Sequence, residues 1–337
     1  MTESHDPTAA AGSADMWGRY WRAGPLHSCA CAFRGNYQGA TAAFWNQQFA
    51  LLPERSLVVD VGTGNGAIPL LAKAVAEARG TSFAIHGVDL ADIDPIAAIK
   101  DGERQFAGIR FHPRTSLTAL PFDDGSVDMV SGQFAIEYAP LDAAVTEVAR
   151  VLGARGRAAF VLHSRDSVIL TTTAEQLESC RLILDDSDFF ARARALAALL
   201  AAAKTPEQRQ ALIGNARADA ARQLLNQAAQ AIGERAANVT TPDLLQSAIT
   251  QVTGTLRAAS VWGEARCNEY LQSCEAALRD ERQRLLDLDA AALSRVDAEH
   301  LLERFRRIGY QHCQLAQLEH APGVLLGWTL CVERRDE

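Results

Sequence analysis

Residues 57–66 have the sequence Leu57-Val58-Val59-Asp60-Val61-Gly62-Thr63-Gly64-Asn65-Gly66. The apolar, β-branched first half is typical of a strand buried on both faces of a parallel sheet. The glycine-rich second half predicts a tight turn, and 67–79 has the apolar spacing of a helix. We expect glycine to be needed because the turn is tight and its backbone lies close to a ligand. Strand, turn and helix together indicate a site for a nucleotide-like cofactor.

The charge beside the turn narrows the choice of cofactor. Gly62, Gly64 and Ala67 also satisfy the loose dinucleotide fingerprint G-x-G-x-x-G/A, so the glycines alone discriminate little. In dinucleotide enzymes a pyrophosphate lies at the helix N-terminus. The Asp60 carboxylate would repel that pyrophosphate, whereas it suits a cationic ligand without phosphate. A nicotinamide enzyme of the Rossmann type is therefore the less favoured alternative.

The pattern D-x-G-x-G-x-G resembles the first motif of the class I S-adenosylmethionine-dependent methyltransferases of the type 11/25 kind. Asp60, Gly62, Gly64 and Gly66 fill its four positions. The resemblance implies an α/β, Rossmann-like methyltransferase sheet, parallel with a terminal antiparallel hairpin, and S-adenosyl-L-methionine as the cofactor. The amino group and the sulfonium of this cofactor are cationic, which agrees with an acidic residue. Thr63 is assigned to the same cofactor site.

The resemblance extends to the next strand. Residues 82–88 are expected to form it, and Asp89 follows at the position where the family's second motif binds the ribose hydroxyls. Leu90 is then expected against the adenine. A third strand is expected over 109–112.

Residues 120–130 are similar to the family's LPF–x–D–x–SFD–x–V run, which leads into a fourth strand over 127–132. Family members often have an aspartate four residues before that leucine, in contact with the adenine amino group, and this chain has Ser116 there. Leu117 and Gln133 are also assigned to the cofactor. Residues 150–156 look like the family's RVLKPGG turn without its proline, after a helix over 141–152 and before a fifth strand over 157–162.

Catalytic candidates follow the ends of the fourth and fifth strands, where open α/β sheets bind their ligands. His163 is the candidate general base because histidine titrates near neutral pH. Glu137 is the second candidate and could orient an amine or a hydroxyl. The alternative is that His163 is a satisfied core histidine and Glu137 a surface charge. The residues assigned to the acceptor are Trp21, His27, Asn36, Tyr37, Tyr138 and Arg165.

The N-terminal 50 residues divide into two parts. Residues 1–15 are small and polar, typical of a disordered tail. Residues 16–50 hold three of the five tryptophans, and the spacing of Trp17 and Trp21 predicts a helix, with a second helix over 40–51. This segment is expected to be a helical lid over the site or, alternatively, plain core packing. His27-Ser28-Cys29-Ala30-Cys31 lacks the four ligands of a structural zinc site, so no metal is expected.

The second half of the chain departs from the family. Residues 171–299 are rich in alanine and leucine without strand signals, which predicts an all-α inserted subdomain that serves as a cap, a dimer contact or both. The methyltransferase core is expected over 51–170 and 300–337. Alternation of apolar residues predicts a closing antiparallel hairpin over 310–318 and 323–333.

Net charge and cysteine content limit the classes of partner and compartment expected for this chain. The net charge of the 337 residues is -8, which favours neither nucleic acid nor an anionic membrane as partner. Seven scattered cysteines favour a reducing cytoplasm over a disulfide framework. A small-molecule acceptor, methylated on oxygen or nitrogen, is therefore predicted, with a homodimer possible. The alternatives are an RNA methyltransferase, although no basic patch and no NPPY signature is seen, and a non-catalytic protein that binds a partner through the helical insert.

Overall fold

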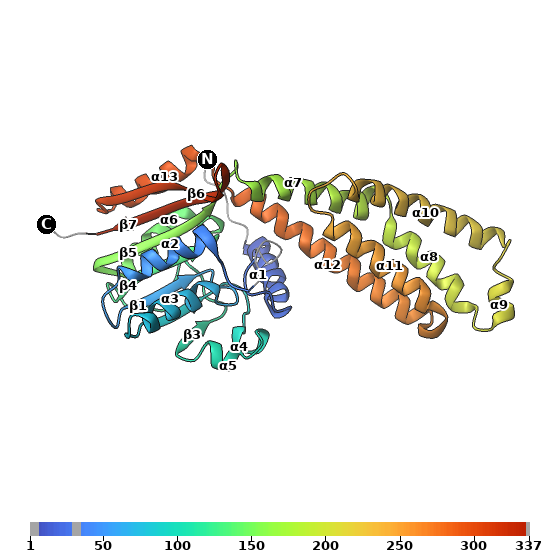
Figure 1. The fold of residues 1–337 in the computed structure, drawn as a ribbon, viewed down its shortest axis with the longest axis horizontal. Helices are drawn as coiled ribbons and strands as arrows, with labels where there is room; N and C mark the ends of the chain where they lie inside the picture. Colours follow the sequence, from blue (N-terminus) through green and yellow to red (C-terminus); the bar gives the residue numbers. More distant parts are fainter. Residues whose placement is uncertain (1–6, 29–34, 335–337) are drawn as a thin grey trace. The chain divides into compact units, whose positions relative to one another are not determined.

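The computed structural model describes residues 7–28 and 35–334, and side chains from residue 12 onward. Residues 1–6, 29–34 and 335–337 lie outside the description, which includes Cys29 and Cys31 of the motif considered for a metal. The chain forms two compact units, one from residues 1–170 with 287–337 and the other from residues 171–286 (Figure 1).

A seven-stranded sheet forms the centre of the first unit, in the order β3-β2-β1-β4-β5-β7-β6. The five strands from β3 to β5 are parallel, and β7 runs antiparallel to both β5 and β6. The bounds are β1 Leu57–Val61, β2 Ala84–Val88, β3 Ile109–His112, β4 Val127–Gln133, β5 Leu152–His163, β6 His312–Ala321 and β7 Val324–Glu333. The predicted fold class, a mostly parallel sheet closed by an antiparallel hairpin, is confirmed.

Helices cover both faces of this sheet. On one face α2 (Gly39–Ala50) and α3 (Ala67–Ala78) bury Trp45, Phe49 and Ile68 against the strands. On the other face α6 (Leu141–Val151) and α13 (Arg295–Arg307) bury Val148 and Leu301. Because Trp45 and Phe49 are both fully buried, α2 belongs to the core. Of the two alternatives for residues 16–50, a lid or core packing, the burial of these rings favours core packing for α2.

The first helix is longer than the sequence predicts. It spans Pro7–Arg22, so it begins inside the segment 1–15 that was expected to be a disordered tail. Its small residues have enough helix propensity to extend the aromatic turn at Trp17 and Trp21. Figure 1 shows α1 beyond the carboxyl ends of the parallel strands, near the short helices α4 (Pro95–Ala98) and α5 (Gly102–Gln105).

Two other boundaries differ from expectation. Strand β5 already begins at Leu152, because the glycine-containing segment expected as a turn forms an irregularity in its pairing with β4. The chain returns to the first unit at Asp287 and not near residue 300. Helix α13 begins at Arg295, where Ser294 and Asp297 form a capping box.

The second unit is entirely helical. It is made of α7 (Val168–Arg181), the π-helix η2 (Leu182–Asp186), α8 (Phe189–Ala202), α9 (Pro206–Gln210), α10 (Ala216–Ala236), α11 (Asp243–Trp262) and α12 (Glu264–Ala291), of which α7 and α12 begin or end in the first unit. It has its own apolar core, with Phe189, Leu225, Leu245 and Leu271 buried. Among the described helices, none combines the length and the apolarity needed to cross a bilayer.

Candidate active site

The glycine turn connects β1 to α3 at the carboxyl edge of the sheet. Gly62, Gly64 and Gly66 have φ values of +61°, +51° and +81°, the left-handed region that favours glycine. A Cβ on Gly64 would lie 2.5 Å from the indole of Trp21, and one on Gly62 would lie 2.5 Å from the Cβ of Ala135. Glycine is therefore required both by the backbone conformation and by neighbouring protein atoms, in addition to any ligand.

Two buried carboxylates flank the turn. Asp60 is the penultimate residue of β1 and lies next to Ser131 of β4, whose Oγ donates to Asp60 Oδ1 at 2.8 Å. Asp89 follows β2 and accepts hydrogen bonds from the main-chain N–H of Gly64 at 2.8 Å and of Ala91 at 2.9 Å. These bonds tie the second strand to the glycine turn, so that both acidic groups lie at the same edge of the sheet.

Burial removes water from both carboxylates, and no positive charge in the described part of the chain offsets that loss. Asp60 is 2% and Asp89 9% exposed. Burial raises the pKa of Asp60 to about 7 and that of Asp89 to about 6, because the charged form loses its hydration. Among the described residues, neither forms an ion pair with a lysine, an arginine or a histidine. A bound cation would supply the missing charge.

The two catalytic candidates form one pair. Glu137 lies in the short helix η1 (Ile136–Tyr138) after β4, and His163 ends β5. Glu137 Oε1 accepts a hydrogen bond from the His163 main-chain N–H at 2.9 Å and lies 2.9 Å from His163 Nδ1. Their side chains are 0% and 4% exposed, so the alternative that Glu137 is a surface charge is wrong.

Several buried polar atoms near these groups lack a protein hydrogen-bond partner in the described part of the chain, among them Asn65 Oδ1, Gln133 Nε2 and Glu137 Oε2. The other amide atom of Gln133 is engaged, since its Oε1 accepts a hydrogen bond from Trp45 Nε1 at 2.5 Å. Buried polar groups are normally satisfied by protein, by water or by a ligand. Their location at the ends of β1 and β4 gives this edge of the sheet hydrogen-bonding groups that a ligand could engage.

Aromatic rings connect the turn to the Glu137–His163 pair. The ring of Trp17 stacks on that of Trp21 with centroids 5.8 Å apart and meets Tyr138 edge-on at 6.4 Å. Tyr138 in turn meets the imidazole of His163 edge-on at 5.9 Å, and the ring of Phe134 stacks on the same imidazole with centroids 4.0 Å apart. The five-ring series gives this edge an apolar surface next to its acidic groups.

The remaining acceptor candidates lie at different places. The imidazole of His27 stacks on Tyr37 at 4.3 Å, and Tyr37 is part of the core against α2 and α3. Asn36 Nδ2 donates to the main-chain O of Ala67 at 2.8 Å, which ties this segment to the first turn of α3. Arg165 is exposed. Of the six acceptor candidates, only Trp21 and Tyr138 belong to the aromatic series.

The residues predicted to contact the adenine differ in exposure and in their contacts. Leu90 is 50% exposed, which leaves its side chain accessible to a ligand. Ser116 Oγ lies 2.8 Å from Thr118 Oγ1 and so is already part of a local hydrogen bond. Leu117 packs against the core on the α6 face.

Sequence reasoning missed three residues of this edge. Ser131 beside Asp60 and Phe134 beside His163 are set by strand register and by the turn after β4, for which the sequence has no periodic signal. Phe134 has φ +55°, uncommon for a residue other than glycine. Asn65 stands between two recognised glycines, and only its buried contacts identify it.

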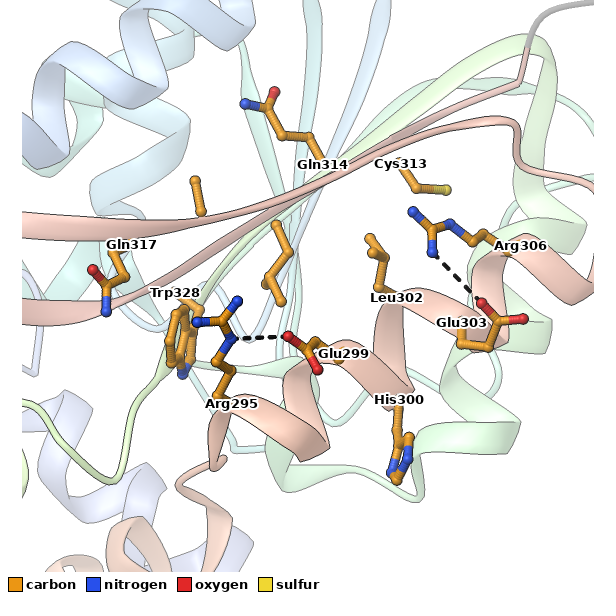
Figure 2. A pocket seen from close by; sticks show the side chains of 12 residues that line it. Arg295, Glu299, His300, Leu302, Glu303, Arg306, Cys313, Gln314, Gln317 and Trp328 are labelled. Atoms are coloured by element: carbon orange, nitrogen blue, oxygen red, sulfur yellow. Dashed lines mark hydrogen bonds and ion pairs between the residues drawn. The ribbon is translucent and has the colours of Figure 1, made fainter.

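A separate groove of about 730 Å³ lies between α13 and the edge strand β6 (Figure 2). Its charged side chains are largely paired along the helix, Arg295 with Glu299 at 2.9 Å and Arg306 with Glu303 at 3.6 Å. It is lined by the hairpin and not by the carboxyl ends of the parallel strands. In the described part of the chain, no cluster of three or more metal-binding side chains is present.

One family model matches the glycine turn and part of the sheet around it. Residues 58–156 match the family model of a methyltransferase domain, which covers less than half of the chain. No curated protein sequence matches this chain.

Several solved structures are similar at low identity. YcgJ of Bacillus subtilis is 23% identical over 42% of this chain and 58% of its own, with a TM-score of 0.33. Geranyl diphosphate C-methyltransferase of Streptomyces coelicolor is 18% identical over 48% and 68%, with a TM-score of 0.34. A Methanococcus maripaludis protein assigned as an S-adenosyl-L-methionine-dependent methyltransferase is 10% identical over 100% and 98%, with a TM-score of 0.42. The match thus spans less than two thirds of the Bacillus protein.

Proposed function

From the premise that this chain carries a class I S-adenosylmethionine-dependent methyltransferase domain, we propose that it transfers a methyl group from S-adenosylmethionine to a small-molecule acceptor. One observation supports this most strongly. Asp60 and Asp89 lie buried at the ends of adjacent strands, with raised pKa values and without a cationic partner among the described residues. A ligand with a positive charge and no phosphate complements this arrangement.

The residues at the carboxyl edge fit the cofactor. Asp89 accepts two main-chain hydrogen bonds, and a carboxylate has capacity for more, so it can also accept from ribose hydroxyls. Asp60 offers negative charge to the cationic part of the ligand, and the unpartnered amide N–H of Gln133 offers a donor. When bound, the cofactor supplies a methyl group already activated by attachment to a positively charged sulfur.

His163 is proposed to accept the proton that an O–H or N–H acceptor loses. A carboxylate at Nδ1 favours the tautomer that keeps the proton there, which leaves Nε2 as the basic nitrogen. Glu137 also binds the main-chain N–H of His163, so it holds the ring and the strand end together. The protein otherwise contributes mainly by aligning the two reactants.

A small acceptor agrees with the composition of this edge. Among the described residues, the acidic side chains buried at this edge are Asp60, Asp89 and Glu137, and its apolar side chains are aromatic. The net charge of -8 gives no general attraction for RNA. A homodimer through the helical unit stays a prediction, which light scattering of the purified chain would test.

Calorimetric titration with S-adenosylmethionine tests the proposal. We expect micromolar binding by the native chain and at least a tenfold loss in both Asp60→Asn and Asp89→Asn. Asp123→Asn is the matched control, because that carboxylate is exposed and makes no hydrogen bond among the described residues. Absence of binding by the native chain, or equal binding by all three variants, would overturn the assignment of the cofactor site.

The role of His163 is tested with a panel of small alcohols, phenols and amines, by measuring release of S-adenosylhomocysteine. His163→Ala should lower turnover by about 100-fold or more while cofactor affinity stays near the native value. Glu137→Gln should lower turnover by a smaller factor, since the amide still accepts a hydrogen bond. Native turnover in His163→Ala would remove this residue from the reaction.

A further inference from the structure

The asparagine within the glycine turn makes two long-range contacts. Asn65 is fully buried, and its Nδ2 donates to the main-chain O of Trp21 at 2.8 Å and of Pro25 at 2.7 Å. These carbonyls lie at the end of α1 and in the segment just after it. One side chain therefore joins the turn that follows β1 to the N-terminal helix.

A ring contact reinforces this connection. The indole of Trp21 lies directly against Gly64, so closely that a Cβ there would lie 2.5 Å from it. Trp21 is 8% exposed and also packs on Ala91 and Ile93, the residues that follow Asp89. The end of α1 thus contacts both segments that flank the buried carboxylates.

The aromatic face of α1, formed by Trp17 and Trp21, reaches the Glu137–His163 pair at its other end. Trp17, one turn before Trp21, meets Tyr138 edge-on at 6.4 Å, and Tyr138 meets His163 at 5.9 Å. The position of α1 on the glycine turn consequently determines where Trp17 lies relative to the proposed acceptor side.

A second polar tie between α1 and this part of the fold is weak. Arg22 Nη1 lies 3.7 Å from Asp92 Oδ2, and the two side chains are 55% and 44% exposed. Exposed ion pairs contribute little to stability, whereas removal of the donor to a buried carbonyl leaves that group unsatisfied. The buried hydrogen bonds of Asn65 therefore anchor the helix end more strongly than this ion pair does.

We propose that Asn65 is a positioning residue that holds the aromatic face of α1 across the site and couples the glycine turn to it. The inference rests on the proposed function in one respect, that the ligand of the turn is S-adenosylmethionine. A ligand that steadies the turn must then also steady α1, because both share the Asn65 amide. Cofactor binding and completion of the aromatic wall on the acceptor side become one event.

Hydrogen–deuterium exchange of the full chain tests this coupling. Loss of two hydrogen bonds corresponds to about a 30-fold change in an equilibrium constant. Without ligand, Asn65→Ala should accelerate exchange of the amides in residues 16–26 by about that factor and leave β1 and β4 unchanged. Asn65→Asp, which keeps the volume but cannot donate, should have the same effect. Arg22→Gln, the control on the same helix, should not.

Addition of S-adenosylmethionine forms the second half of the test. In the native chain it should slow exchange in residues 16–26, and in Asn65→Ala this slowing should be lost even at concentrations at which calorimetry shows saturation. Native exchange of α1 in both Asn65 variants would overturn the anchoring role. Binding to the native chain without any slowing of α1 would overturn the coupling. If the native chain does not bind S-adenosylmethionine, the proposed function fails, while the comparison without ligand still decides whether Asn65 anchors α1.

Discussion

Replacement of Asp60 by asparagine should stabilise the cofactor-free protein at neutral pH while weakening cofactor binding at least tenfold. The substitution keeps the shape of the side chain and an oxygen that can accept the Ser131 hydroxyl, which donates at 2.8 Å. It removes a negative charge from a position that is 2% exposed. A site prepared for a cation thus reduces the stability of the protein that lacks its ligand.

The magnitude follows from the pKa. Burial raises the pKa of Asp60 from its ordinary value of 3.8 to about 7. The folded state then holds this proton more tightly than the unfolded state, so the free energy of unfolding decreases as pH rises from about 4 to about 7 and is level above that. Each pKa unit corresponds to about 1.4 kcal/mol. The ionised carboxylate therefore costs about 4 kcal/mol at pH 8, of which about 3 kcal/mol arises above pH 5.

The assay is urea unfolding at pH 5 and pH 8, followed by tryptophan fluorescence without cofactor. The stabilisation of Asp60→Asn relative to the native chain should be larger at pH 8 by about 3 kcal/mol. This comparison between two pH values cancels any effect of asparagine on packing. Asp123→Asn serves as the exposed control. A stabilisation that is the same at both pH values would refute the reasoning, because it would show that Asp60 is not an uncompensated buried charge.

Three further outcomes are expected. The affinity for S-adenosylmethionine should fall about tenfold between pH 7.5 and pH 6 in calorimetric titrations, because protonation of Asp60 and Asp89 competes with a cationic ligand; constant affinity would contradict this. Gly64→Ala should lower the thermal midpoint and weaken cofactor binding, because the φ of Gly64 is +51° and the indole of Trp21 occupies the space that a Cβ would need. The control is Gly233→Ala on α10, where a Cβ meets no neighbouring atom, and it should be neutral or stabilising. Trp45→Phe should cost about 1 kcal/mol in urea unfolding, because it removes the donor to the Gln133 side chain; an unchanged midpoint would show that this bond contributes nothing.

Much of the fold could be predicted because its signals are local. The β-branched run before the glycines, the amphipathic segment after 141 and the alternation at the C-terminus each report their own secondary structure. The helical character of 171–286 followed from composition in the same way. The sequence could not choose between a lid and core packing for residues 16–50, because that choice depends on neighbouring segments. In the structure Trp45 and Phe49 of α2 are fully buried against the sheet.

The residues of the site also differ in whether the sequence could predict them. Asp60, Asp89 and the glycines could be named from the sequence, because they follow directly on strands whose carboxyl ends must share one edge in a parallel sheet. The contact of Glu137 with His163, the placement of Ser131 beside Asp60 and the anchoring of α1 by Asn65 depend on register and packing between segments far apart in the chain. Such contacts leave no period or motif in a single sequence. The sequence therefore determined the strand–turn–helix and its acidic character, whereas only the tertiary structure decided which side chains surround it, because burial and pairing arise from segments that meet only in the folded chain.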